Sequence, residues 1–360
     1  MFLEKEGKLI YSYDGETVCI EAWGKDALRV RATKNRSFTG RDWALEAKDA
    51  HAGEVEIFED PSAKGGAFAN MYEGTDTSYG KITNGKLHAV IDSGSVITFY
   101  HEDGRVLLKE HFRRLRDEES MPLNIMGREY SNGVGDNFRI VARFVARKGE
   151  KIFGMGQYQQ HELDLKGCML ELAQRNSQVS VPFYLSSIGY GFLWNNPGVG
   201  QVMFANNGTE WVTESGKEID YLVIAGDTPA EIEENYMTLT GKPPMMPEYG
   251  MGFWQCKLRY WNQEQLLSVA RKYKELGVPL DVIVVDFFHW TKQGEFKFDP
   301  KYWPDVPGMC RELKEMGIQV VVSVWPTVDI YSENFEEMKE KGYLVRTEHG
   351  VPLTMLCGGN

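Results

Sequence analysis

The residues best suited to chemistry in this sequence form one short run, from Asp286 to Trp290, at the end of an apolar stretch. The stretch reads VPLDVIVVDFFHW, so a carboxylate and four rings follow a β-branched segment. A carboxylate accepts hydrogen bonds from two hydroxyl groups at once, and an aromatic face packs well against the C–H face of a pyranose ring. This composition is suited to holding a sugar. The alternatives are that Asp286 caps the next turn in solvent and that Phe287, Phe288 and Trp290 only pack a loop.

Two further groups follow neighbouring apolar stretches. Trp325 ends the segment VVVSVW, where an indole either floors a sugar site or closes the top of a barrel. Arg259 belongs to the cluster KLRYW, which either lines the rim of a pocket or forms a loop with solvated charges. Asp305 and Asp329 have the sequence context of loop and turn residues.

The elements that carry these residues alternate between strand and helix over residues 248–360. Strands are expected at about 250–255, 278–286 and 318–325, and helices at about 262–276, 306–316 and 332–342. A nearly continuous β-branched run such as VPLDVIVVD is typical of a parallel strand buried on both faces. Parallel barrels carry their chemistry on the loops after the strands. The pattern therefore predicts the first three βα units of a (β/α)8 TIM-type barrel, with the remaining strands expected beyond Asn360.

Residues 1–226 predict an N-terminal β-sandwich, because short apolar or alternating runs recur between Gly, Asn, Asp and Pro. Residues 227–247 predict a connector. It begins as a helix capped by Asp227 and ends in a segment with three prolines, which remove backbone donors and fix φ. The expected order is sandwich, connector and incomplete barrel.

Composition excludes several classes of protein. A net charge of −12 and an isoelectric point near 5.2 argue against nucleic-acid binding. The five cysteines are widely spaced, so neither a disulfide framework nor a metal site is indicated, and no cofactor is implied. The N-terminal residues lack the apolar segment of a signal peptide, and no run of about 18 apolar residues suggests a membrane span. We expect a cytoplasmic protein.

Five blocks of the sequence resemble glycoside hydrolase family 31, in the family's order. The match is good over about 151–360 and loose over the first 150 residues. The blocks lie at residues 153–196, 241–260, 278–290, 298–326 and 340–350. The resemblance implies a retaining glycosidase that acts on terminal α-linked sugars and uses two aspartates, a nucleophile and an acid/base. In the family the nucleophile follows the fourth barrel strand, so we expect no catalytic residue in this chain and both beyond Asn360.

The resemblance also implies roles for individual residues. Asp286 matches the family's sugar-hydroxyl-binding carboxylate, and Trp325 matches its strand-three tryptophan. Family α-glucosidases usually carry Asp-Ile-Asp where this chain has Asp286-Phe287-Phe288, and the second Asp can bind the glucose 6-hydroxyl. A phenyl ring at Phe288 removes that partner and fills the space of the CH₂OH group, which favours xylose.

The sequence therefore favours an α-xylosidase whose partner is an α-linked oligosaccharide or glycoside, with homo-oligomer formation left open. Its expected substrate-binding residues are Asp286, Phe288, Trp325, Trp290, Phe287 and Arg259. The alternative within the family is an α-glucosidase. The alternative from another class is a non-catalytic carbohydrate-binding protein.

Overall fold

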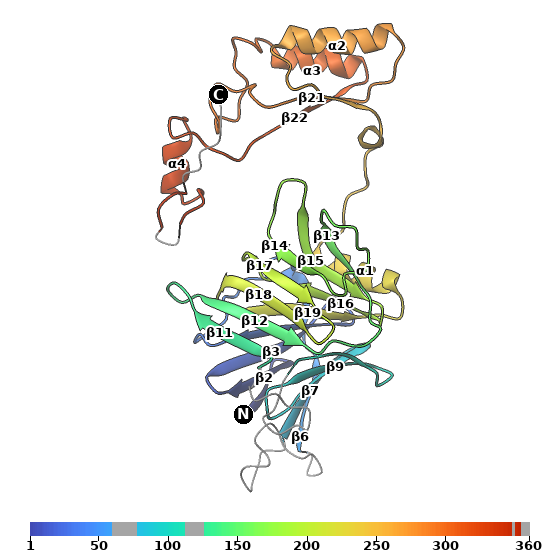
Figure 1. The fold of residues 1–360 in the computed structure, drawn as a ribbon, viewed down its shortest axis with the longest axis vertical. Coiled ribbons are helices and arrows are strands. Elements are labelled where there is room, and N and C mark those ends of the chain that lie inside the picture. The colour runs from blue at the N-terminus through green and yellow to red at the C-terminus, as the bar shows by residue number, and fades with distance from the viewer. Residues whose placement is uncertain (60–77, 112–125, 348–349, 354–360) are drawn as a thin grey trace. The chain divides into compact units, whose positions relative to one another are not determined.

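The computed structural model describes residues 1–59, 78–111, 126–347 and 350–353. The chain divides into two compact units, residues 1–243 and 244–360 (Figure 1). Each unit is described by itself. The predicted domain boundaries at 226 and 247 stay predictions.

The largest sheet of the first unit is antiparallel and has the order β1-β2-β3-β4-β19-β16-β15-β13, with β5 paired to β3. Its strands are β1 (Phe2–Lys5), β2 (Lys8–Tyr13), β3 (Glu16–Trp23), β4 (Ala27–Thr33), β5 (Ala50–His51), β13 (Ile152–Gln157), β15 (Val179–Ser186), β16 (Tyr190–Trp194) and β19 (Ile219–Ala225). The central strand β19 is buried at every position, so both faces of this sheet are covered.

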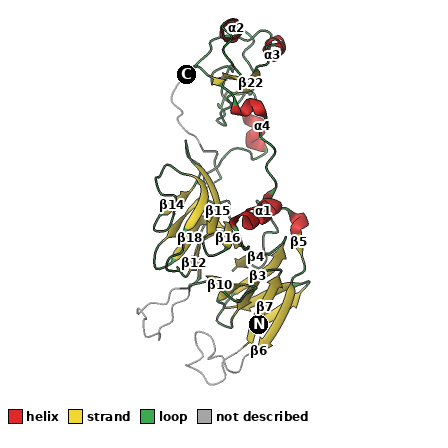
Figure 2. Cartoon of the chain, turned by 90° about the vertical axis from the view of Figure 1, so that its right-hand side faces the viewer, coloured by secondary structure: helices red, strands yellow, loops and turns green. Residues whose placement is uncertain are grey.

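Two smaller antiparallel sheets complete the first unit, in the orders β10-β9-β8-β7-β6 and β11-β12-β18-β17-β14 (Figure 2). Their strands are β6 (Glu54–Glu59), β7 (Ser78–Asn84), β8 (Leu87–Ile91), β9 (Ile97–His101), β10 (Val106–Lys109), β11 (Arg128–Asn132), β12 (Phe138–Phe144), β14 (Met169–Leu172), β17 (Gly200–Phe204) and β18 (Thr209–Gly216). A bridge between Glu110 and Phe144 links the two sheets.

The core of the first unit lies between the large sheet and the two smaller ones. Inward-facing side chains of all three sheets form one buried cluster, which includes Ile20 from β3, Phe99 from β9 and Trp211 from β18. The Trp211 indole packs against the Phe192 ring at a centroid distance of 5.1 Å. Three sheets packed around one apolar core confirm the predicted β-sandwich.

Helix α1 (Pro229–Thr240) packs against the opposite face of the large sheet, on β16 and β19 (Figure 1). Its Ile232 and Leu239 are buried in a second apolar cluster with Leu193 of β16. The helix is capped by Thr228, whose hydroxyl accepts from the Glu231 amide at 3.2 Å. The predicted cap at Asp227 is therefore one residue early, because Thr228 holds the extended backbone of a cap position.

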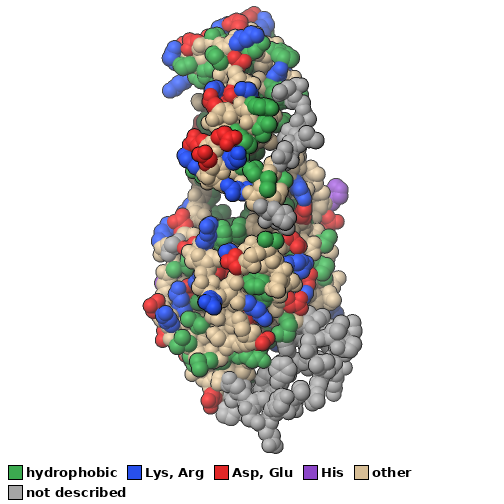
Figure 3. Space-filling view, turned by 90° about the vertical axis from the view of Figure 1, so that its left-hand side faces the viewer, with side chains coloured by type: hydrophobic (Ala, Val, Ile, Leu, Met, Phe, Trp, Pro, Cys, Tyr) green, Lys and Arg blue, Asp and Glu red, His purple; other side chains and the backbone are tan. Residues whose placement is uncertain are grey.

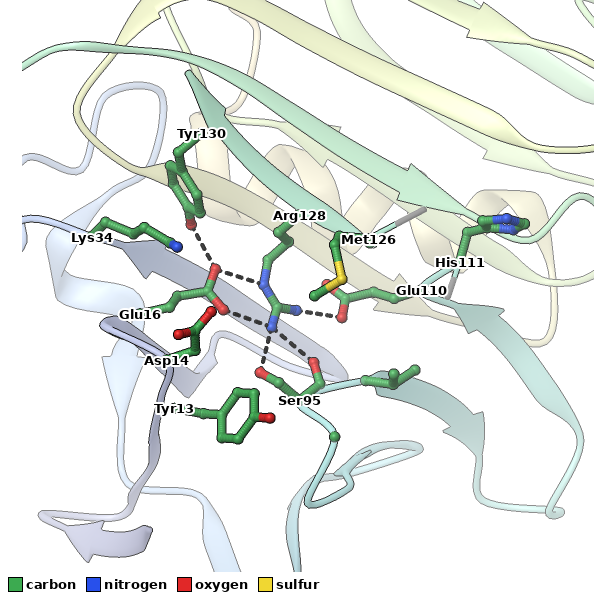
Figure 4. Close-up of a pocket in the computed structure, with 13 residues that line it drawn as sticks. Tyr13, Asp14, Glu16, Lys34, Ser95, Glu110, His111, Met126, Arg128 and Tyr130 are labelled. Atoms are coloured by element: carbon green, nitrogen blue, oxygen red, sulfur yellow. Dashed lines mark hydrogen bonds and ion pairs between the residues drawn. The ribbon is translucent and has the colours of Figure 1, made fainter. Parts of the chain in front are cut away.

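A buried charge cluster around Arg128 joins several strands of the first unit (Figure 4). The guanidinium pairs with Glu110 and with Glu16, and also donates to the Ser95 hydroxyl at 2.6 Å. Tyr130 donates to Glu16 at 2.8 Å. Burial raises the pKa of Glu110. Burial also favours the neutral form of Glu16, but the charge and hydrogen bonds of Arg128 outweigh it and lower the pKa of that carboxyl.

Loss of the Arg128 charge is expected to destabilise the first unit strongly. Arg128→Met leaves the buried carboxyl groups of Glu110 and Glu16 without their cation, and removing one partner of a buried pair costs about 3–5 kcal/mol. Urea unfolding monitored by tryptophan fluorescence measures the effect. The control is Arg139→Met, which breaks a half-exposed pair with Glu214 and should cost less than about 1 kcal/mol. Equal stability of the two variants would contradict the prediction.

The second unit contains a parallel sheet of three strands, β20-β21-β22, with α2 and α3 as crossovers (Figure 1). Its elements are the 3₁₀ turn η2 (Glu248–Met251), β20 (Trp254–Gln255), α2 (Gln263–Glu275), β21 (Val282–Val285), α3 (Val306–Glu315), β22 (Gln319–Val322) and α4 (Phe335–Glu340). Asn262 caps α2 and Asp305 caps α3 through their side chains. Leu266 and Leu313, one from each long helix, pack with Ile283 of the sheet. The elements β20-α2-β21 and β21-α3-β22 are two consecutive parallel βαβ units, which confirms the predicted start of a barrel.

Several elements of the second unit are shorter than predicted. The first strand begins at Trp254, because residues 248–251 form the 3₁₀ turn. The last helix begins at Phe335, since Ser332 forms a turn with the Asn334 amide instead of capping a longer helix. Strand β21 is mostly buried, whereas β22 is only half-buried. A bridge between Arg346 and Pro352 confirms the predicted terminal hairpin within the described residues, while 348–349 and 354–360 lie outside them.

Acidic and basic side chains are interspersed over the face shown in Figure 3. Among the described residues, no helix is both long enough and apolar enough to cross a membrane. The predictions about nucleic acid, oligomer formation and location in the cell stay predictions.

Candidate functional site

The predicted site residues of the second unit follow the carboxyl ends of its parallel strands. The register pairs Gln255 of β20 with Ile283, and Val285 of β21 with Val322 of β22. Cys256 and Asp286 therefore directly follow two adjacent strands. Strand ends meet at one edge in a parallel sheet, which is the edge where barrel enzymes carry their chemistry.

Four of the predicted rings form one aromatic cluster. Phe287 stacks on Trp325 with a centroid distance of 5.2 Å and an interplanar angle of 18°. The ring centroid of Phe288 lies 4.2 Å from that of Phe287 and 6.4 Å from that of Trp325. The centroids of Trp290 and Trp325 are also 6.4 Å apart. All four rings are half-buried. The structure brings these residues together, which leaves both the sugar-binding role and the loop-packing alternative available to them.

The carboxylate of Asp286 is half-buried beside this cluster. Its Oδ1 accepts a hydrogen bond from the Phe287 amide at 2.8 Å, and its Oδ2 lies 3.8 Å from the Cys256 Sγ. The first contact fixes the side-chain orientation, as in a capping role. A carboxylate has about four acceptor positions, so these contacts leave acceptor capacity for ligand hydroxyl groups.

Phe288 adopts an unusual backbone conformation, with φ of +62°. Bulky residues rarely occupy this left-handed region, and strained residues of this kind concentrate at functional sites. The strain supports a role for the Phe288 ring itself, since asparagine or aspartate would adopt this backbone more easily.

Arg259 contacts the aromatic cluster directly. Its guanidinium lies 4.9 Å from the centroid of Phe288 and 4.1 Å from that of Trp261. Its Nη1 also donates to the Phe288 carbonyl oxygen at 3.3 Å. Arg259 therefore holds Phe288 by both its ring and its backbone. The structure thus shows which residue Arg259 contacts, whereas the sequence predicted only a place at the rim of a pocket.

In the full-length protein, replacement of Arg259 by methionine is expected to weaken the xylose selectivity that the family resemblance implies. The variant loses a cation–π contact and a long hydrogen bond, together worth about 1–2 kcal/mol. We expect the kcat/KM ratio of α-xyloside to α-glucoside to fall about 5–30-fold. The control is Lys301→Met, which removes an exposed cation from the Tyr302 ring outside the cluster. A ratio unchanged in Arg259→Met would show that Arg259 does not position Phe288.

His289 is buried, and its ring contacts those of Trp290 and Phe298, with a centroid distance of 4.7 Å in each pair. Its Nδ1 lies 3.1 Å from the Asp286 carbonyl oxygen, and burial lowers its pKa. His289 therefore supports the loop from inside. Within the described ranges, no group of three or more His, Cys, Asp or Glu side chains is arranged to hold a metal ion.

A cavity of about 270 Å³ lies next to the aromatic cluster in the second unit. It is lined by Trp290, Trp325, His289 and Phe298, among others, but not by Asp286 or Phe288. The cavity therefore does not coincide with the predicted sugar-binding position, which requires Asp286 and Phe288. Phe298 begins the loop 298–305 before α3, which is held in place by the cap at Asp305 and by the buried Trp303.

The contact between Cys256 and Asp286 is the part of this site that sequence reasoning missed. Burial and the nearby Asp286 charge both raise the pKa of the Cys256 thiol, which keeps it protonated at neutral pH. A possible signal was the position of Cys256 directly after the first strand. Asp329 is a turn residue as expected, since its carboxylate accepts from the Tyr331 amide at 2.8 Å.

Two family descriptions match the sequence. Residues 17–202 match the glycosyl hydrolase 31 N-terminal galactose mutarotase-like domain, and residues 243–356 match the glycosyl hydrolases family 31 TIM-barrel domain. Together they cover most of the chain.

Named relatives agree with these matches. The chain is 42% identical over 369 residues to an uncharacterized family 31 glucosidase, ORF2, of Pseudescherichia vulneris, covering 99% of this chain and 66% of that protein. It is 36% identical over 219 residues to an alpha-xylosidase of Saccharolobus solfataricus, covering 58% of this chain and 30% of that protein.

A solved structure is also similar. It is a GH31 alpha-xylosidase from a soil metagenome, complexed with xylose, with 46% identity and a TM-score of 0.88 over 100% of this chain and 52% of that one. The chain thus spans between about a third and two thirds of the length of these three relatives. These matches confirm the resemblance, and the chain belongs to glycoside hydrolase family 31.

Proposed function

We propose that the full-length protein is a retaining glycosidase that releases α-linked xylose from the non-reducing end of oligosaccharides or glycosides. The observation that carries the proposal is Phe288, an aromatic ring held in a strained conformation two residues after Asp286. Two of the relatives described above are named alpha-xylosidases, one of them in complex with xylose.

In this proposal Asp286 accepts hydrogen bonds from sugar hydroxyl groups, while the aromatic cluster packs against the ring. A xylose ring carries no group at C5, so the phenyl ring of Phe288 can occupy the space that glucose needs for its CH₂OH. A buried hydroxyl without a partner is a strong source of discrimination. The nucleophile and acid/base are not assigned to Asp286, because the family resemblance places both later in the sequence.

The proposal is tested with an aryl α-xyloside and proton NMR of the released sugar. We expect hydrolysis without an added metal or cofactor, with α-xylose as the first product, as retention requires. An initial β-xylose product, or no hydrolysis of α-linked sugars, would overturn the mechanism or the activity, respectively. Hydrolysis of α-glucosides only would favour the alternative of an α-glucosidase.

A further inference from the structure

The first unit carries an exposed tryptophan, Trp43, in an unusual backbone conformation. This residue is distant in sequence from the site around Asp286. Trp43 is 44% exposed and has φ of +54°. A large ring in a left-handed conformation is rare, and an exposed one does not contribute its area to a core. Strained backbone persists only where the surroundings hold it, and it is often found at binding sites.

The backbone around Trp43 is held by a buried ion pair. Arg29 of β4 pairs with Asp220 of β19, and both side chains are almost fully buried. The same guanidinium pairs with Asp42 at 2.7 Å and donates to the Arg41 carbonyl oxygen at 2.8 Å. The two residues before Trp43 are thus tied to the central strands of the large sheet. The position of Trp43 is built into the fold.

A second set of contacts fixes both sides of the same loop. The buried carboxylate of Glu218 accepts from the amide and the hydroxyl of Thr39, each at 2.8 Å. Asn195, also buried, accepts from the Ala44 amide at 3.2 Å and donates to the Asp42 carbonyl oxygen at 3.1 Å. Residues 39–44 are therefore anchored before and after the exposed ring.

Trp43 borders a cavity of about 430 Å³, within the range of small-molecule sites. Its other lining residues are mostly polar and include Arg41, Asn137, Asn196, Ser215, Lys217 and Glu218. The Asn137 amide donates to the Ser215 hydroxyl at 3.1 Å, and the Asn196 amide donates to the Asp220 carbonyl oxygen at 2.8 Å. Each amide has a further donor hydrogen and acceptor positions.

The charges at this cavity are mostly satisfied within the protein. The ammonium of Lys217 pairs with Asp136 at 2.6 Å, and Glu218 is occupied by Thr39. The guanidinium of Arg41 lies 5.3 Å from the Trp43 ring centroid. One aromatic ring beside amide and hydroxyl groups, with two of the three charged lining residues occupied within the protein, suits a neutral ligand that has both C–H faces and hydroxyl groups.

We propose that this cavity is a second glycan-binding site, formed wholly by the first unit. A pyranose ring of a neutral oligosaccharide stacks on Trp43, and its hydroxyl groups bond to the side chains of Asn137, Asn196 and Arg41. The choice of glycan as ligand rests on the proposed function. The role of the site is to hold a longer substrate chain, and not to cleave it.

Affinity electrophoresis of the full-length protein tests the proposal, in gels with and without soluble xyloglucan, a β-glucan with α-xylosyl side chains. The wild type should migrate more slowly in the polysaccharide gel. Trp43→Ala should bind at least about fivefold more weakly, and Asn137→Ala should show a smaller loss. Trp43→Phe should retain part of the retardation. The matched control is Phe58→Ala, which removes a 40% exposed ring from β6 of another sheet.

The kcat/KM for an aryl α-xyloside should be the same in Trp43→Ala and wild type, because this small substrate does not reach a second site. Equal retardation of wild type and Trp43→Ala would overturn the proposal, as would the absence of retardation in the wild type. A large fall in the unfolding temperature of Trp43→Ala would also overturn it, since Trp43 would then be packed within the protein. Retardation that depends on Trp43 in a protein inactive on the aryl α-xyloside would support the second site and reject the proposed activity.

Discussion

Replacement of Asp286 by alanine is expected to lower kcat/KM for an aryl α-xyloside by about 10²–10⁴-fold in the full-length protein. The carboxylate follows β21 and has acceptor capacity beyond its bond to the Phe287 amide. Hydrogen bonds from two sugar hydroxyl groups to a charged acceptor contribute about 1.5–3 kcal/mol each. Asp286→Asn keeps the shape and one acceptor oxygen, so its loss should be smaller.

The control for this prediction lies at the other end of the same strand. Asp281 precedes β21, and its carboxylate accepts from the Phe253 amide at 3.0 Å. Asp281→Asn keeps an acceptor there and should retain activity within about threefold, because the amino-terminal edge of barrel strands serves stability. Activity of Asp286→Ala within threefold of wild type would remove Asp286 from the site.

Replacement of Phe288 by aspartate should change sugar selectivity more than any other substitution in the aromatic cluster. The shorter side chain makes room for CH₂OH and restores an acceptor for the 6-hydroxyl. A site built to hydrogen-bond a substrate hydroxyl can reject the analogue that lacks this hydroxyl by about 10⁴-fold. We therefore expect the α-xyloside to α-glucoside ratio of kcat/KM to fall by at least about 100-fold. Aspartate also fits the φ of +62° better than phenylalanine does.

Phe288→Leu separates the two causes of this effect. Leucine makes room without adding an acceptor, so its ratio should lie between those of wild type and Phe288→Asp. If Phe288→Asp remains folded and keeps the wild-type ratio, Phe288 is not the source of the selectivity.

The alternation of strands and helices in the second unit was predictable because its signals are local. The β-branched run at 282–285 and the caps at Asn262 and Asp305 lie within a few residues of the elements that they define. The position of Asp286 at a strand end follows from the same run. The 3₁₀ turn at 248–251 was not predictable in this way, because nothing in EYGM opposes a strand as clearly as the preceding prolines do.

The contacts that make the site specific depend on distant pairings. Cys256 lies near Asp286 because β20 and β21 pair in one particular parallel register, which apolar runs do not determine. The left-handed conformation of Phe288 runs against the preference of its own residue type. Arg128 lies 112 residues from Glu16 in sequence, and its strand REYSN lacks apolar alternation, so no local pattern predicts their ion pair.

The most direct test of the account is the ratio of kcat/KM for an aryl α-xyloside to that for the matching aryl α-glucoside, measured with the wild-type full-length protein. The account predicts a clear preference for the α-xyloside, at least about tenfold, because Phe288 occupies the space of the glucose CH₂OH and provides no partner for its hydroxyl. A preference for the α-glucoside would contradict the proposed role of Phe288, although the chain would remain a member of family 31.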